Sequence, residues 1–125
     1  MADPADFWAR PIFRVTDVDA SVAYYRDVLG FSVVWTHGNS PMIVAQVERG
    51  GIDIILDANS AMPRPAGTSV LTLSLHHPEN LDELFQRFRE RGARVIVEPF
   101  SVVWQEGARQ FDIADLDGNL LLFWS

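Results

Sequence analysis

Short runs of alternating apolar and polar residues fill the first half of the chain, interrupted once by a segment whose apolar residues have helical spacing. In residues 10–15 apolar side chains recur at every second position, which predicts a half-buried strand. Apolar residues at helical spacing in residues 20–29 predict a helix, with Asp19 as its N-terminal cap and Gly30 as its stop. Three further strands are predicted, so this half has the order βαβββ; they cover residues 31–36, 42–47 and 52–56.

The second half repeats this order after a loose connection. Residues 58–68 hold two prolines and a glycine, and we interpret them as a linker. A strand at 69–75 precedes a helix that ends at Gly92, and Asn80 and Glu83 predict a capping box at its start. The remaining strands are predicted at residues 94–97, 100–104, 110–114 and 120–124.

The repeat indicates a single α+β domain, residues 1–125, made of two βαβββ modules. Module one covers about 8–57, the linker 58–68, and module two about 69–125. One such module buries little by itself. We therefore expect the two to form a mixed sheet that curls around a central cavity, with the helices on its convex side.

The amino-acid composition excludes or disfavours several classes of function. The chain has 125 residues and no cysteine, which excludes disulfides, thiolate metal sites and a cysteine nucleophile. A net charge of −7 disfavours nucleic-acid binding and would attract a cationic small molecule, although acidity also simply aids solubility. No apolar run is long enough to span a membrane, and residues 1–6 look like a short loose leader rather than a secretory signal. We expect a cytoplasmic protein.

Two segments carry a family resemblance: residues 17–31, DVDASVAYYRDVLGF, and residues 107–119, GARQFDIADLDGN. Together they resemble the glyoxalase / bleomycin-resistance / dioxygenase superfamily, which has the vicinal oxygen chelate fold. Leu116 stands where that pattern most often has proline. The resemblance covers about residues 10–124 and implies the fold more than the function, because this fold supports many chemistries.

The resemblance also implies where a metal would bind. Metal-using members place ligands on the first and last strands of each module, which here correspond to Arg10, Ile55, Val70 and Leu122. Arginine stays protonated, and the three aliphatic side chains have no donor atom. We therefore predict no metal and no other cofactor.

The resemblance to metal-free bleomycin-resistance proteins implies a homodimer that sequesters an antibiotic or another amphiphilic ligand in grooves between subunits. An alternative is a lyase, isomerase or dioxygenase-like enzyme without the usual metal, using Arg10 or Arg14 as electrophile and Asp53 or Asp112 as base. A third possibility is a regulatory or structural subunit whose cavity is filled by its own side chains.

The predicted ligand-binding residues are those expected to face the cavity: Arg10, Arg14, Trp35, Asp53, Ile55, Trp104, Asp112, Leu122 and Trp124. The two arginines could hold an anionic or carbonyl group, or could form internal ion pairs with Asp53, Asp57 or Asp112. The tryptophans could line a groove or pack in the core or a dimer interface. His37, His76 and His77 are interpreted as loop histidines, and Asp115, Asp117 and Asn119 as turn formers.

Overall fold

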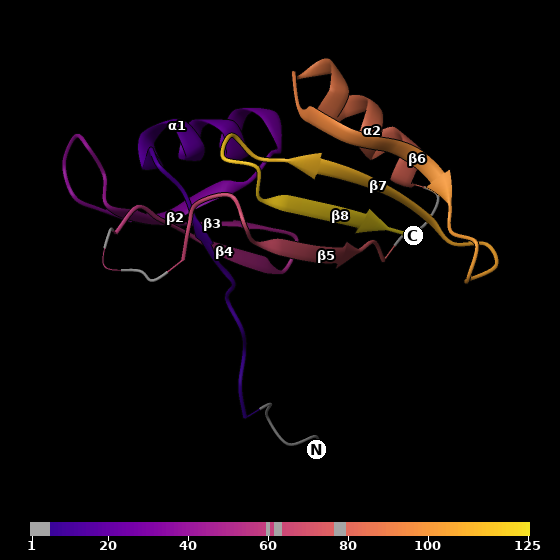
Figure 1. Cartoon of the computed structure of the whole chain (residues 1–125), viewed down its shortest axis with the longest axis horizontal. Helices are drawn as coiled ribbons and strands as arrows, with labels where there is room; N and C mark the ends of the chain where they lie inside the picture. The colour runs from indigo at the N-terminus through magenta and orange to yellow at the C-terminus, as the bar shows by residue number, and fades with distance from the viewer. Residues whose placement is uncertain (1–5, 60, 62–63, 77–79) are drawn as a thin grey trace.

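The computed structural model describes residues 6–59, 61, 64–76 and 80–125, so the leader predicted at 1–6 lies almost wholly outside the described residues, as does His77. Figure 1 shows two modules side by side, each with its helix on one side of its strands. Module one contains β1 (Ile12–Arg14), α1 (Val18–Ala23), η1 (Tyr24–Val28), β2 (Ser32–His37), β3 (Val44–Arg49) and β4 (Ile52–Asp57). Module two contains β5 (Val70–Ser74), α2 (Leu81–Glu90), β6 (Arg94–Ser101), β7 (Arg109–Ala114) and β8 (Leu120–Trp124).

The strands form two four-stranded mixed sheets with the same internal order. The first has the order β1-β4-β3-β2 and the second β5-β8-β7-β6. In each sheet the first strand pairs in parallel with the last strand, and the other pairs are antiparallel. The α+β class and the two βαβββ modules predicted from the sequence are confirmed.

Several local predictions were wrong, each for a physical reason. Residues 94–101 form the single strand β6, because a register shift between Val97 and Phe100 accommodates Pro99 at the sheet edge. Asp17, not Asp19, caps the first helix, and its carboxylate accepts a hydrogen bond from the Ala20 amide at 3.0 Å. Asn80 occupies the N-cap position of α2 but makes no side-chain capping bond. His37 ends β2 rather than lying in a turn.

The two sheets meet at β1 and the segment that leads into β5. The Arg14 carbonyl of β1 is satisfied by groups of the linker and of the second module, not by a paired strand. The Arg14 carbonyl accepts from the Gly67 amide at 3.3 Å and from Asn119 Nδ2 at 3.0 Å. A side chain on Gly67 would collide with the Asp117 carbonyl, since its Cβ would lie 2.0 Å from that oxygen. Glycine therefore makes this close approach possible.

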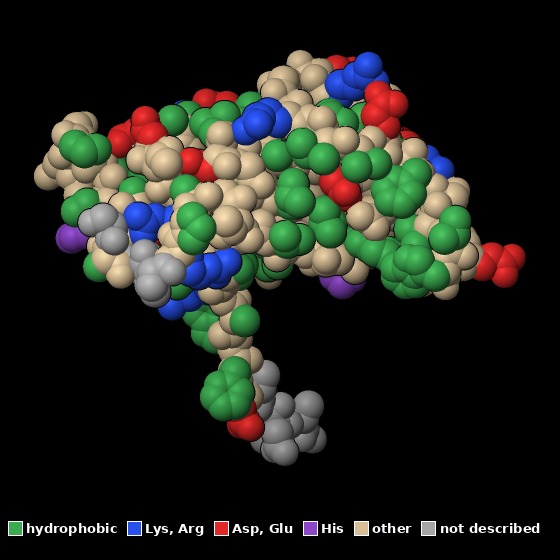
Figure 2. Space-filling view, viewed as in Figure 1, with side chains coloured by type: hydrophobic (Ala, Val, Ile, Leu, Met, Phe, Trp, Pro, Cys, Tyr) green, Lys and Arg blue, Asp and Glu red, His purple; other side chains and the backbone are tan. Residues whose placement is uncertain are grey.

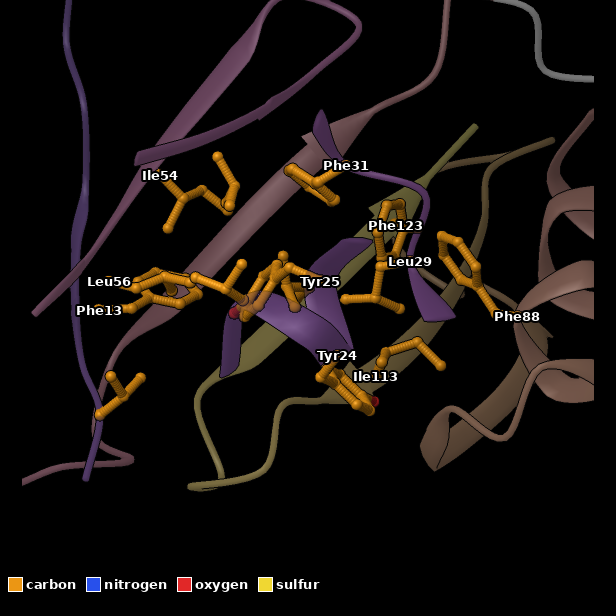
Figure 3. Packing of buried hydrophobic residues seen from close by; sticks show 14 of the residues in the cluster. Phe13, Tyr24, Tyr25, Leu29, Phe31, Ile54, Leu56, Phe88, Ile113 and Phe123 are labelled. Carbon is orange, nitrogen blue, oxygen red and sulfur yellow. The ribbon is translucent and has the colours of Figure 1, made fainter. Parts of the chain in front are cut away.

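One hydrophobic core serves both modules. It combines buried residues from α1, η1, β1, β3 and β4 with others from α2, β7 and β8. Figure 3 shows Tyr25 and Leu29 of the first module beside Phe123 and Ile113 of the second. The rings of Phe111 and Phe123 stack at 5.0 Å between centroids. Because side chains alternate along a strand, the residues between these core positions lie on the opposite face of each sheet.

The carboxylate of Asp115 fastens the two modules together. Asp115 is fully buried, and its Oδ1 accepts hydrogen bonds from the backbone amides of residues 117, 118 and 119 at 2.9–3.0 Å. Its Oδ2 accepts from Asn119 Nδ2 at 2.9 Å and from the Tyr25 hydroxyl at 3.0 Å. The turn-forming role predicted for this segment is confirmed, and the same turn anchors a helix of the other module.

Burial raises the pKa of Tyr25 well above its ordinary value of 10.0, and the nearby Asp115 carboxylate raises it further. An unfolded tyrosine ionises near pH 10, so above that pH the unfolded chain releases a proton that the folded chain keeps. Stability is therefore fully present below pH 10 and falls as pH rises. The chain has two tyrosines, no cysteine and no lysine, so few other side chains titrate in this window.

We predict that Tyr25→Phe lowers the free energy of unfolding by about 1.5–3 kcal/mol at pH 7, because a buried hydrogen bond to a carboxylate is lost. The difference from the wild type should shrink between about pH 10 and pH 11, because the wild type loses the contribution of Tyr25 there. Urea unfolding followed by circular dichroism measures both effects. A difference that stays constant up to pH 11 would contradict the assignment.

Candidate functional site

Eight of the nine predicted site residues fall on two surface patches, one on the outer face of each sheet, and Arg14 lies in neither patch. The register explains this division. In module one Ile12 and Gln46 both lie opposite Ile55, and in module two Thr72 and Asp112 both lie opposite Leu122. We call the first group the Gln46 patch (Arg10, Trp35, Gln46, Asp53, Ile55) and the second the Asp112 patch (Trp104, Gln110, Asp112, Leu122, Trp124).

Gln46 organises the first patch. Its side chain is only 4% exposed although it faces away from the core. Its Oε1 accepts hydrogen bonds from Arg10 Nη1 and from Trp35 Nε1, both at 2.9 Å, and its Nε2 donates to Asp53 Oδ1 at 3.0 Å. One amide thus fixes a cation, an indole and a carboxylate on the same face.

The two arginines differ in their surroundings. Arg10 is exposed, and its guanidinium lies 4.8 Å from the centre of the Trp8 ring. It reaches Asp53 through Gln46. Arg14 is half-buried and donates a hydrogen bond from Nη1 to the backbone oxygen of Asn59.

The second patch is aromatic. Trp104 lies in the turn after β6 and is 71% exposed; its ring meets that of Trp124 with 5.0 Å between centroids and 51° between planes. Trp124 Nε1 is buried and has no hydrogen-bond partner among the described residues. Asp112 accepts a hydrogen bond from Gln110 Nε2 at 2.7 Å. Figure 2 shows hydrophobic side chains gathered over β7, β8 and the turn that follows β6.

Within the described residues of one chain, the two patches lie on open surface and not inside a hollow. Two hollows are found among the described residues, and none of the nine predicted residues is part of the lining of either. One hollow of ≈ 650 Å³ lies beside the start of α1, between Asp17 and Pro41. The other, of ≈ 530 Å³, lies between the β3–β4 turn and the end of β5.

Comparison with known proteins identifies the family. The sequence profile of the Glyoxalase/Bleomycin resistance protein/Dioxygenase superfamily matches residues 9–123. The chain belongs to this superfamily. A search of curated protein sequences finds no significant match.

Solved structures share the fold over nearly the whole chain. TioX from Micromonospora sp. ML1 is 22% identical, with a TM-score of 0.72 and 94% of each chain covered. TnmS3, an antibiotic binding protein from Streptomyces sp. CB03234, is 24% identical, with a TM-score of 0.71, 96% of this chain covered and 97% of that one. A superfamily member from Sphaerobacter thermophilus DSM 20745 is 23% identical, with a TM-score of 0.75, 94% of this chain covered and 96% of that one.

The residues present do not fit the metal that other superfamily members use. Arg10, Ile55, Val70 and Leu122 lie on the outer faces, with no carboxylate, imidazole or amide among them. Among the described residues, no group of three or more His, Asp or Glu side chains could hold a metal ion. Nor does any helix in the described ranges have the length and apolar character needed to cross a membrane.

Sequence reasoning missed Gln46. Its one signal is a long polar side chain in the middle of an otherwise apolar strand run, Val44-Ala-Gln-Val. That signal could have shown that the outer face of β3 is polar. It could not have shown that Arg10 and Trp35, which lie 36 and 11 positions earlier in the chain, both donate to Gln46 Oε1, because those contacts exist only after folding.

We predict that Gln46→Leu lowers the free energy of unfolding by roughly 1–3 kcal/mol, because Arg10, Trp35 and Asp53 lose their shared partner. The matched control is Gln110→Leu in the second module, where one hydrogen bond to Asp112 is lost; it should cost less, about 1 kcal/mol. Chemical denaturation of both variants measures the difference. Equal losses in the two variants would show that the convergence on Gln46 has no energetic weight.

Proposed function

We propose that this protein is a metal-free binding protein that sequesters a planar, cationic, amphiphilic small molecule such as an antibiotic. The main support for this proposal is the set of residues on the outer faces, at the positions where metal-using members of the superfamily place their metal ligands. Arg10 and three aliphatic residues stand at those positions, and tryptophans and carboxylates surround them. Such a surface offers stacking and charge attraction but no Lewis acid.

The chemistry of the patches supports this choice. Trp35 is 39% exposed and Trp104 is 71% exposed, so both rings are at least partly open to solvent. Indole faces stack on planar heterocycles and attract cations. Asp53 and Asp112 are half-buried carboxylates held in place by glutamines, and the chain as a whole carries a net charge of −7. The relative TnmS3 is an antibiotic binding protein, which is consistent with this assignment.

A second copy of the chain is the proposed cover for these faces. Large apolar side chains are exposed on both sheets, among them Ile12, Val34, Val70 and Ile96. Exposed apolar surface of this kind is typical of an interface. A homodimer would bury it and would turn the two open patches into grooves.

Catalysis without a metal is the alternative, and the contacts favour binding over it. Arg10 and Asp53, the nominated electrophile and base, are both engaged by the same amide of Gln46. Asp112 is engaged by Gln110. These bonds suit a rigid recognition surface more than a group that must exchange protons during turnover.

We expect native mass spectrometry of the purified protein to show a dimer that carries no divalent metal, and elemental analysis of the same sample to agree. The physical reason is the absence of donor atoms at the four superfamily ligand positions. A retained organic mass would identify the ligand. One firmly held divalent metal per subunit would overturn the proposal.

As a direct test of binding, we predict that bleomycin quenches the tryptophan fluorescence of the protein saturably. The bleomycin released from the protein should be chemically unchanged. Trp104→Ala should weaken binding about fivefold, because one stacking contact is worth about 1 kcal/mol. The control is Val103→Ala, which changes an adjacent, 98% exposed side chain without removing a ring. Chemical alteration of the recovered bleomycin would point to the enzymatic alternative instead.

A further inference from the structure

The hollow of ≈ 530 Å³ lies between the modules, apart from the Gln46 and Asp112 patches, and we call it the seam slot. It exists because β1 is only three residues long and pairs with the last half of β4, at Ile55 to Asp57. The beginning of β4 therefore has no strand at its edge, and the end of β5 lies across the gap. Six apolar side chains line the slot: Phe31, Ile52, Leu73, Leu75, Leu84 and Phe123.

Arginine side chains gather at this slot. Arg49 and Arg87 line it. Arg91 is close by, since a Cβ placed on Gly30 would lie 2.7 Å from Arg49 Nη1 and 3.7 Å from Arg91 Nη1. Arg49 donates a hydrogen bond to the Leu29 carbonyl and lies 5.6 Å from the centre of the Phe88 ring. The guanidinium is thus held against apolar surroundings.

No carboxylate of the described residues forms an ion pair with any of these three arginines. Other arginines do have such partners: Arg26 pairs with Asp27, Arg89 with Glu98, and Arg109 with Asp82. Burial lowers the pKa of Arg49, and the positive charges of Arg87 and Arg91 lower it further. In a chain with a net charge of −7, this unbalanced cluster of cations is unexpected. Arg49 is half-buried whereas Arg87 and Arg91 are exposed, so the cost of a partly buried charge without an ion-pair partner among the described residues falls on Arg49.

We propose that the seam slot binds a small organic anion, with a carboxylate held by the arginines and an aliphatic or aromatic tail among the apolar residues. A guanidinium offers a planar pair of donors that matches a carboxylate, and the cavity volume lies in the range of small-ligand sites. The apolar lining favours an amphipathic acid over a bare inorganic ion. This site shares no residue with the Gln46 or Asp112 patches and prefers the opposite charge, so it stands independently of the proposed function.

We choose decanoate to test binding at the seam slot, and decanol, which has the same chain length and no charge, as the control. We expect decanoate to shift the methyl NMR signals of Ile52, Leu73 and Leu84, and to leave those of Ile55, Val70 and Leu122 unchanged. The affinity should fall as salt is raised, because an ion pair contributes to it. Shifts confined to Ile55, Val70 and Leu122 would place the acid on the outer faces and overturn the assignment. The absence of saturable binding would also overturn it.

A pair of double variants separates charge at the slot from charge in general. Arg87→Gln with Arg91→Gln removes two cations at the slot, and Arg26→Gln with Arg89→Gln removes two that are paired with acids elsewhere. We expect the first pair to weaken decanoate binding about tenfold or more, and the second to change it by less than about twofold. Decanol binding should be the same in both. Equal effects of the two pairs on decanoate would refute the proposal.

Discussion

The buried carboxylate of Asp115 is the contact on which the arrangement of the modules depends. It closes the turn before the last strand and also accepts the hydroxyl of Tyr25 from the other half of the chain. The neighbouring Tyr24 hydroxyl donates to the Ala114 carbonyl at 2.7 Å, so two adjacent tyrosines secure the same junction. Because the helix of one module is fixed to the turn of the other, the apolar faces of both sheets are used in one shared core.

That shared core determines where the candidate binding surfaces lie. Once the helix-side faces are buried together, the remaining face of each sheet is turned outward, and its side chains are free to contact other molecules. These faces carry indoles and carboxylates. The edge gap left by the short β1 carries arginines instead. We therefore propose two kinds of site with opposite charge preference, one on the outer faces of the sheets and one at the seam between the modules.

Local pattern predicted most of the fold, and the exceptions have identifiable causes. The β8 strand begins and ends where alternation placed it, because its apolar residues and the preceding turn agree. Strand β6 was split in the prediction at Pro99, whereas the structure continues it by shifting register at an edge where no partner needs the missing amide. Asp17 and Asp19 both suit a cap, and only the final backbone path gives Asp17 that role and directs Asp19 to the Met42 amide.

The sequence by itself determined the order of the elements, the internal repeat, and the lack of metal-ligating side chains at the superfamily positions. The order and the repeat follow from spacing along the chain, which is a local property. The ligand positions come from the family resemblance, and the residue types at those positions are read from the sequence. Only the tertiary structure decided that Arg10 and Trp35 share the oxygen of Gln46 and that Trp104 meets Trp124. It also decided that three arginines gather at the seam slot, where no described carboxylate pairs with them. Such contacts join residues far apart in the chain. Their geometry is set by how the two modules pack, which no local pattern encodes.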